Sequence, residues 1–210
     1  MRAAIDHLYA RLFYISIEER PRSGIIHAAL LGRRGRRILI AGSKGAGKTS
    51  LALHLVRSGY EFEGDEHAFV DIDGVIARPR ACRVKETSLP LLPDITDAIL
   101  SAPVYVDVRG SRVFSLAPSM IGASWRIERG NVDCVFVLQP NHGGYSSIRP
   151  MPAMMTAQSL ISEIGMRRAD RGASIGAIAA LVNLAKCFDL SLGDHEGATK
   201  CIERALDDPQ

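Results

Sequence analysis

The sequence predicts an α/β fold in which a mixed, hairpin-rich sheet surrounds a phosphate-binding loop and helices gather toward the C-terminus. Residues 42–49, Gly-Ser-Lys-Gly-Ala-Gly-Lys-Thr, match the nucleotide-binding pattern G-x-x-x-x-G-K-[ST] at every position. Short apolar runs separated by glycine-containing turns fill residues 25–116, as in antiparallel hairpins. Three segments beyond residue 150 have helical composition. A simple parallel, doubly wound sheet would not contain so many hairpins.

Length and charge limit the classes of protein to which the chain can belong. With 210 residues, 47% of them hydrophobic, it can bury one sizeable core, and we expect a single domain over residues 1–210. The 26 basic and 23 acidic residues give a formal charge of +3, which is too balanced to indicate a nucleic-acid partner.

Cysteine spacing and hydropathy indicate a protein of the cytoplasm. The four cysteines are far apart and form no C-x-x-C pair, so their spacing predicts neither a zinc site nor a redox motif. They are Cys82, Cys134, Cys187 and Cys201. No apolar stretch approaches the roughly 18 residues of a membrane span, and no signal-peptide core is present. We therefore expect reduced thiols, a cytoplasmic location and no membrane contact.

The first elements lead into the glycine loop. Apolar residues recur at helical spacing over Ala3–Tyr14, which predicts a helix there. Ile25–Leu31 and Arg37–Ala41 are predicted strands joined by the turn Gly-Arg-Arg-Gly-Arg-Arg. We interpret its arginines as a solvated hairpin tip, with a phosphate-rich partner as the alternative. The helix that begins near Lys48 should end at Ser58-Gly59, because glycine suits a helix C-terminus.

The remaining elements follow from turn signals and apolar runs. Asp73-Gly74 and Arg109-Gly110-Ser111 are typical hairpin turns, and the continuous apolar run Cys134–Leu138 indicates a central strand. The other predicted strands are Tyr60–Phe62, Ala68–Ile72, Val75–Ala77, Val104–Val108 and Arg112–Leu116. The predicted C-terminal helices are Met151–Met166, Ala173–Cys187 and His195–Leu206.

The glycine loop predicts binding of a nucleoside triphosphate, for which we expect ATP with Mg²⁺. Glycines allow the backbone to turn several N–H groups inward at a helix N-terminus, which forms an anion-binding concavity. Lys48 is then placed to meet the β and γ phosphates, and the Thr49 hydroxyl to bind Mg²⁺. The predicted nucleotide-binding residues are Gly42, Ser43, Lys44, Gly45, Ala46, Gly47, Lys48, Thr49 and Ser50.

A kinase or hydrolase also needs carboxylates to complete the Mg²⁺ site and to deprotonate the attacking hydroxyl. Asp65 and Glu66 are the first candidates, since they follow a predicted strand beside the loop and come after Gly64, which allows close backbone approach. Val104-Tyr105-Val106-Asp107 is the better match to a hydrophobic strand that ends in aspartate, so Asp107 remains an alternative.

Residues 25–66 resemble the catalytic domain of HPr kinase/phosphorylase, the bacterial enzyme that phosphorylates a serine of the phosphocarrier HPr. In that family, five features follow one another along the chain: a histidine on a strand, the glycine loop, a helix, the sequence arginine-glycine-histidine and a pair of acidic residues. The corresponding features here are His27, the loop at residues 42–49, Ser58-Gly59-Tyr60 and Asp65-Glu66, without gaps. The resemblance implies a P-loop kinase core whose hairpin-rich sheet is of the type shared with ATP-dependent phosphoenolpyruvate carboxykinase.

The resemblance also implies roles for individual residues. Lys48 and Thr49 become phosphate and magnesium ligands, Asp65 the base, and His27 a neighbour of the acidic pair. Glu66 stands where the family has a second aspartate, and it is a candidate metal ligand. A further metal-binding glutamate of the family lies in a signature segment that has no clear copy here, and Glu86 is the nearest candidate. The other interpretation of His27 is that it is an ordinary strand residue with no role in the reaction.

With only 41 residues before Gly42, we expect a minimal kinase core without the family's N-terminal domain. Short relatives of this kind have varied acceptors, including modified peptides and small molecules, and family members often form hexamers. We therefore expect an ATP-dependent kinase that acts on a hydroxyl, with a serine of a protein or peptide as the preferred acceptor. A kinase of a small hydroxylated metabolite is the first alternative. A nucleotide-binding switch without transfer is the second, although the chain has no N-K-x-D guanine motif.

Phosphoryl transfer also calls for a cation that compensates charge in the transition state. Arg149 is one candidate, and Arg167, Arg168 and Arg171 form another group. The segment Ala77-Arg78-Pro79-Arg80 could form a substrate wall. For each of these, a solvated surface arginine is the simpler interpretation. His142-Gly143-Gly144 is predicted to be a turn, with a loop near the site as the alternative.

Overall fold

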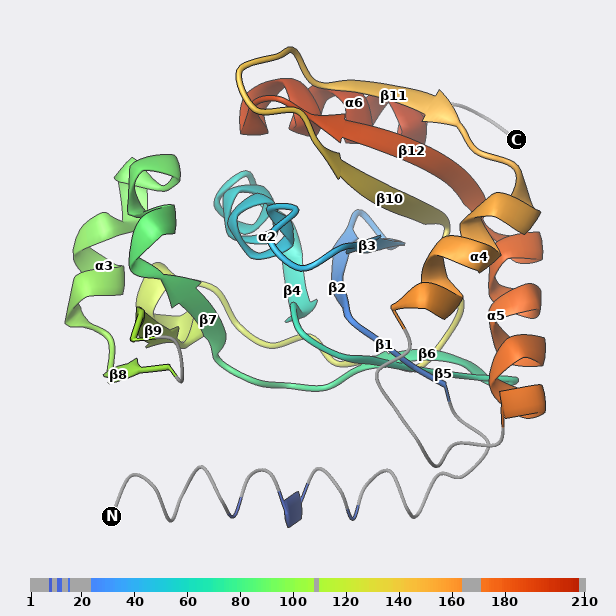
Figure 1. The fold of residues 1–210 in the computed structure, drawn as a ribbon, viewed down its shortest axis with the longest axis horizontal. Helices are drawn as coiled ribbons and strands as arrows, with labels where there is room; N and C mark the ends of the chain where they lie inside the picture. The colour runs from blue at the N-terminus through green and yellow to red at the C-terminus, as the bar shows by residue number, and fades with distance from the viewer. Residues whose placement is uncertain are drawn as a thin grey trace.

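A six-stranded mixed sheet lies at the centre of the fold in the computed structural model, which describes residues 8, 11, 12, 15, 24–107, 110–163 and 171–207 (Figure 1). Its strands, in spatial order, are β11 (Ser147–Pro150), β12 (Lys186–Leu192), β10 (Cys134–Pro140), β3 (Arg36–Gly42), β2 (Ala28–Arg33) and β4 (Glu61–Gly64). β12, β10 and β3 are parallel, and the other pairings are antiparallel. The three parallel strands therefore end at one edge, where β3 enters the glycine loop.

Helices cover both faces of this sheet (Figure 1). Helices α2 (Lys48–Arg57) and α6 (His195–Asp207) pack on one face, and α4 (Ala153–Ser162) and α5 (Arg171–Leu184) on the other. Successive residues of a central strand enter opposite cores: Ile38 and Ile40 face α2, whereas Leu39 and Ala41 face the other side. A strand buried on both faces must be apolar at every position, which accounts for the continuous run in β10.

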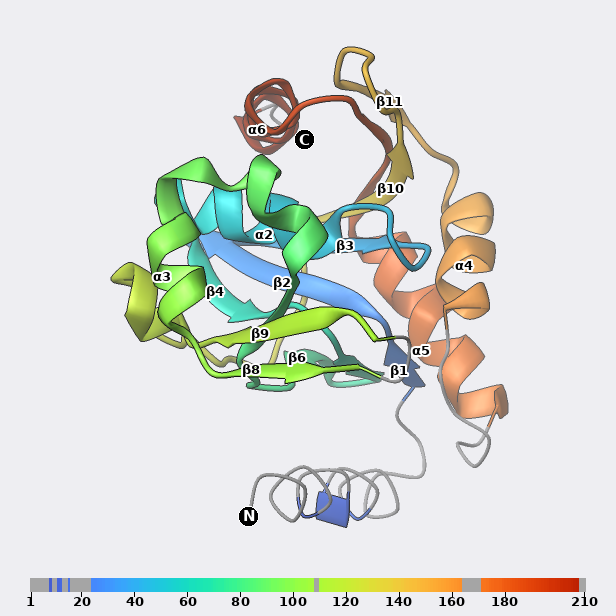
Figure 2. The same cartoon turned by 60° about the vertical axis from the view of Figure 1, so that its left-hand side comes forward.

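Two small antiparallel sheets complete the fold. One contains β1 (Gly24–Ile26), β5 (Ala68–Asp71) and β6 (Gly74–Ala77), in the order β1-β5-β6. The other has the order β7-β9-β8, with β7 at Cys82–Lys85, β9 at Arg112–Leu116 and β8 at Val104–Val106. The connection from β7 to β8 runs through 3-10 turns at Glu86–Leu91 and Pro93–Ile95 and helix α3 (Thr96–Ser101), which lie beside α2 (Figure 2). A further 3-10 turn spans Pro118–Ile121.

Several sequence predictions are confirmed. The chain is a mixed α/β protein with a multi-stranded mixed sheet. The β2–β3 hairpin turns at Arg34 and Gly35, both with positive φ (51° and 75°). Asp71 pairs with Gly74 across the predicted β5–β6 turn. Helix α2 ends at Arg57, and Gly59 adopts φ 91° just beyond it.

Other predictions need correction. The predicted strand Ile25–Leu31 is two strands in different sheets, because the chain crosses from one sheet to the other at His27. The predicted helix Ala173–Cys187 ends at Leu184, and strand β12 follows, which the sequence analysis missed. The predicted helix Met151–Met166 is observed as α4 from Ala153 to Ser162.

Part of the prediction lies outside the described residues. This holds for most of the predicted helix Ala3–Tyr14, for the end of Val104–Val108, for the end of Met151–Met166, and for Arg167 and Arg168. Within the part of the chain that is described, no helix is both long and apolar enough to cross a membrane.

Candidate active site

A cavity of about 960 Å³ opens where the parallel strands end. The glycine loop forms one wall, from Lys44 to Ser50. His27, Asp65 and Glu66 also line the cavity, so three separated sequence features meet in one place. The volume lies at the upper end of the range usual for small-molecule sites.

The glycine loop has the backbone geometry of an anion cradle. Gly45 and Gly47 adopt φ of 90° and 98°, a region that side chains disfavour. A Cβ on Gly47 would lie 2.7 Å from Cδ2 of Leu192, so a side chain here would require Leu192 to move. The loop then runs directly into α2, whose N-terminal N–H groups favour a bound anion. These residues fit a triphosphate.

Lys48 is buried at the base of this loop, with 5% of its surface exposed. Its Nζ donates hydrogen bonds to the carbonyl oxygens of Gly42 at 2.5 Å and Ser43 at 2.9 Å. Burial lowers the pKa of Lys48, and the nearby carboxylates of Glu163 and Asp65 oppose that shift. The loop therefore holds a cation at its base.

Asp65 lies directly after β4 and is 5% exposed. Burial raises its pKa to about 6, although a hydrogen bond with Thr49 works in the opposite direction. A carboxyl with a pKa near neutrality can take up a proton in the working pH range. The contact with Thr49 also joins two hard oxygen ligands, the kind that Mg²⁺ prefers. The Thr49 hydroxyl therefore fits a magnesium ion held jointly with phosphate, and Asp65 lies beside it.

Glu66 has a different environment from Asp65, its neighbour in sequence. Its carboxylate receives a hydrogen bond from Arg80 at 2.6 Å and lies 3.4 Å from Arg83. Burial raises the pKa of Glu66, but Arg80, Arg83 and two histidines outweigh that effect and lower it below the ordinary value. Glu66 is therefore a carboxylate at neutral pH, while Asp65 is poised to exchange a proton.

Two histidines stand beside the acidic pair. The rings of His27 and His67 are 6.1 Å apart, and both line the cavity. Burial lowers the pKa of both, for His67 to about 4, and the charge of Lys48 contributes at His27. Both rings are therefore neutral at physiological pH. The sequence analysis missed His67, although its place two residues after Asp65 was a usable signal.

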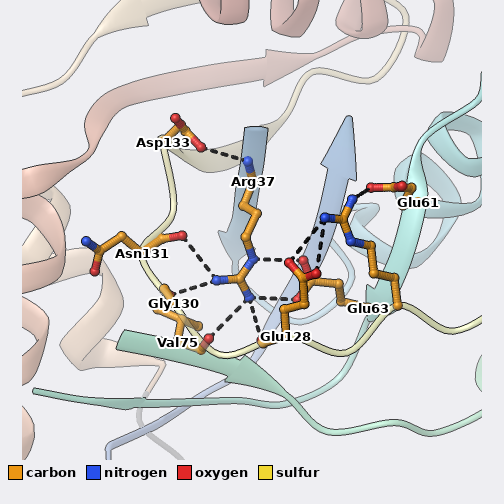
Figure 3. Close-up of polar contacts among 9 residues, drawn as sticks. Arg37, Glu61, Glu63, Val75, Glu128, Gly130, Asn131 and Asp133 are labelled. Carbon is orange, nitrogen blue, oxygen red and sulfur yellow. Dashed lines mark hydrogen bonds and ion pairs between the residues drawn. The ribbon is translucent and has the colours of Figure 1, made fainter. Parts of the chain in front are cut away.

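A buried ion pair supports the strand that ends at Asp65 (Figure 3). The Nε and Nη2 atoms of Arg37 donate to the two carboxylate oxygens of Glu63 at 2.9 and 2.7 Å. The same guanidinium donates to backbone carbonyls of Val75, Glu128, Gly130 and Asn131. All five of its N–H groups thus have acceptors. Because Glu63 is two residues before Asp65, this cluster fixes the path of the chain into the site.

Not every predicted site residue lies in the cavity. The Glu86 carboxylate is 2.6 Å from Arg112 and is not among the lining residues. Arg149 pairs with Asp189 at 2.8 Å, away from the cavity lining. Asp107 does line the cavity, and its carboxylate accepts a hydrogen bond from the Ser111 amide. In the ranges that the structure describes, no group of three or more His, Cys, Asp or Glu could hold a metal ion by itself.

Further lining residues were not among the predicted site residues. Arg83 and Lys85 are on β7, a strand that the sequence analysis did not predict, and Tyr105 is on β8, within the predicted strand Val104–Val108. His195 follows β12, and its Nε2 lies 3.3 Å from Oγ of Ser50. Its ring stacks on His54 at 5.3 Å. Without β12 in the predicted topology, nothing in the sequence placed His195 beside the glycine loop.

Comparisons with known proteins give distant structural likenesses only. No family model matches the chain, and no curated protein sequence matches it. Among solved structures, the HPr(Ser) kinase/phosphatase from Coxiella burnetii is similar with a TM-score of 0.31 and 15% sequence identity. The match covers 54% of this chain and 65% of that chain, less than two thirds of its length.

Proposed function

We propose that this protein is a P-loop kinase of the HPr kinase type, which transfers the γ-phosphate of ATP to a hydroxyl group, with a serine of a protein or peptide as the acceptor. One observation carries the proposal: Asp65, a carboxyl with 5% of its surface exposed, lines the same cavity as Lys48 and Thr49 of the glycine loop. The residue suited to deprotonate an acceptor therefore lies in the same cavity as the residues suited to hold the phosphate end of the donor.

Different residues of the chain have different roles in phosphoryl transfer. Loop N–H groups and Lys48 would bind the β and γ phosphates, and Thr49 with Glu66 would hold Mg²⁺. The metal, when bound, neutralises charge on the phosphates. Asp65 then accepts the proton of the acceptor hydroxyl as its oxygen attacks phosphorus. Neutral His27 and His67 add no positive charge that would stabilise the carboxylate form of Asp65 and weaken it as a base.

Label transfer tests this proposal. The protein is incubated with γ-labelled ATP, Mg²⁺ and a library of serine-containing peptides, and label in peptide is counted. We expect the transfer rate of Asp65→Asn to be at least about 100-fold lower than that of the unmodified sequence, because general base catalysis accelerates a reaction roughly 10²–10⁴-fold. Glu86→Gln is the matched control, since that carboxylate pairs with Arg112 outside the cavity lining. Undiminished transfer by Asp65→Asn excludes Asp65 as the base.

A further inference from the structure

A second wall of the cavity, separate from the glycine loop, carries two cations on one strand. Arg83 and Lys85 alternate with the buried residues Cys82 and Val84 in β7, so both side chains leave the core on the same face. Both line the cavity. Lys85 lies opposite Val113 on β9, and Val113 lies opposite Tyr105 on β8, which makes one row across the sheet.

We propose that Arg83 and Lys85 bind a negatively charged group of the acceptor, so that the substrate class is an acidic acceptor. In a peptide this means a serine with glutamate or aspartate nearby. The inference rests on the proposed function, and it adds what that function leaves open, namely the chemistry that selects the acceptor.

The carboxylates that line the cavity already have partners. Glu66 is bound by Arg80 at 2.6 Å, and Asp65 is hydrogen-bonded to Thr49. The carboxylate of Asp107 accepts from the Ser111 amide at 2.9 Å, and that of Asp194 from the Gly197 amide at 2.6 Å. These four acidic groups are held by the protein itself.

Arg83 and Lys85, the two cations of β7 that line the cavity, have fewer acidic partners. Arg83 is 3.4 Å from a carboxylate oxygen of Glu66, which Arg80 already binds more closely. No ion pair between described residues involves Lys85. Arg83 shares its carboxylate partner with Arg80, and Lys85 has no ion pair among the described residues, so these two cations attract a further anion.

The position of these cations favours the acceptor over the nucleotide. The triphosphate already has the loop N–H groups, Lys44 and Lys48. Arg83 instead touches Glu66, next to the proposed base Asp65, where an acceptor hydroxyl must arrive. The Arg83 guanidinium lies over the ring of Tyr105, 5.7 Å from its centroid. A guanidinium held in one plane suits bidentate binding of a carboxylate.

Paired peptides test the inference. Serine peptides that differ only by glutamate or glutamine at each flanking position are compared by kcat/KM in the label-transfer assay. At one or more positions we expect kcat/KM for the glutamate peptide to exceed that for the glutamine peptide by about 10-fold or more. This ratio corresponds to the free energy that a charge-assisted hydrogen bond typically contributes. Lys85→Gln should reduce the preference to about 1, Lys85→Arg should keep it, and Lys85→Glu should reverse it toward lysine peptides.

The matched control is Arg112→Gln. Arg112 is a cation of the same small sheet, but it pairs with Glu86 and does not line the cavity. This variant should keep the full preference for the glutamate peptide. A preference that survives in Lys85→Gln, or equal use of both peptides by the unmodified sequence, overturns the inference and leaves the kinase proposal standing.

A binding measurement separates the two proposals when no transfer occurs. Lysines are labelled by reductive ¹³C-methylation, and the Lys85 resonance is assigned by its loss in Lys85→Gln. We expect the glutamate peptide to shift this resonance and the glutamine peptide to leave it in place. A shift without any label transfer supports the anion site and counts against the kinase. A Lys85 resonance that neither peptide moves overturns the anion site.

Discussion

Replacing Glu63 by alanine removes the carboxylate partner of a buried arginine. Glu63 is 1% exposed, and Arg37 is 8% exposed. Alanine leaves the Nε–H group of Arg37 and one Nη2–H group without their carboxylate acceptors, in a place that water does not reach. The guanidinium keeps its backbone carbonyl acceptors but loses the only opposite charge that it contacts in Figure 3.

The structure sets the expected size of this effect. Breaking a buried ion pair from one side costs about 3–5 kcal/mol, because the remaining charge is uncompensated. The double variant Arg37→Met, Glu63→Leu should recover only part of this loss. Four backbone carbonyls now accept from Arg37 and lose that donor in the variant, although those of Val75 and Gly130 still accept from each other's backbone N–H.

Urea unfolding followed by circular dichroism measures the change. With a slope of about 2 kcal/mol per molar urea, the midpoint of Glu63→Ala should fall by about 1.5–2.5 M. Glu61→Ala is the matched control on the same strand, because the ion pair between Glu61 and Arg126 is exposed and should contribute about 1 kcal/mol or less. If both variants unfold within about 1 kcal/mol of each other, the buried cluster does not have the stabilising role assigned to it.

Three further changes have defined outcomes. Lys48→Met should weaken ATP binding at least about 10-fold in isothermal titration, because it removes the cation at the base of the loop; unchanged affinity contradicts that role. Gly47→Ala should also reduce ATP affinity, since the new Cβ clashes with Leu192 and φ is 98°; binding at the original strength shows that the loop conformation is not needed. The pKa of Asp65 is raised to about 6, so the protonated carboxyl favours the fold at low pH, and that contribution is lost as pH rises from about 4 to 6. Asp65→Asn should therefore be up to about 3 kcal/mol more stable than the unmodified sequence at pH 7 and show no such gain at pH 4 in urea unfolding; equal stability at both pH values contradicts a buried, destabilised carboxylate.

Local patterns in the sequence were sufficient for the hairpins and for the glycine loop. The hairpin turn and the end of α2 each contain a glycine at positive φ, Gly35 and Gly59, so a few neighbouring residues determine them. The loop meets His27 and Asp65 through neighbouring strands. His27 directly precedes β2, which pairs with the loop strand β3, and Asp65 directly follows β4, which pairs with β2.

Other parts depended on contacts that local pattern does not contain. β12 follows α5 without a glycine or proline, so the predicted helix Ala173–Cys187 runs on into Lys186 and Cys187, the first two residues of the strand. Glu86 is the closest glutamate in sequence to the expected position, yet its pairing with Arg112 across the small sheet takes it out of the cavity lining. Arg83 and Lys85 acquire a place in the site only through the pairing of β7 with β9.

The central claim is that the loop and Asp65 form one phosphoryl-transfer site. A crystal structure with a non-hydrolysable ATP analogue and Mg²⁺ tests it most directly. The claim predicts the γ-phosphate between Lys48 and Asp65, with the metal bound by the Thr49 hydroxyl. A triphosphate bound outside the glycine loop, or one whose γ-phosphate points away from Asp65, contradicts it.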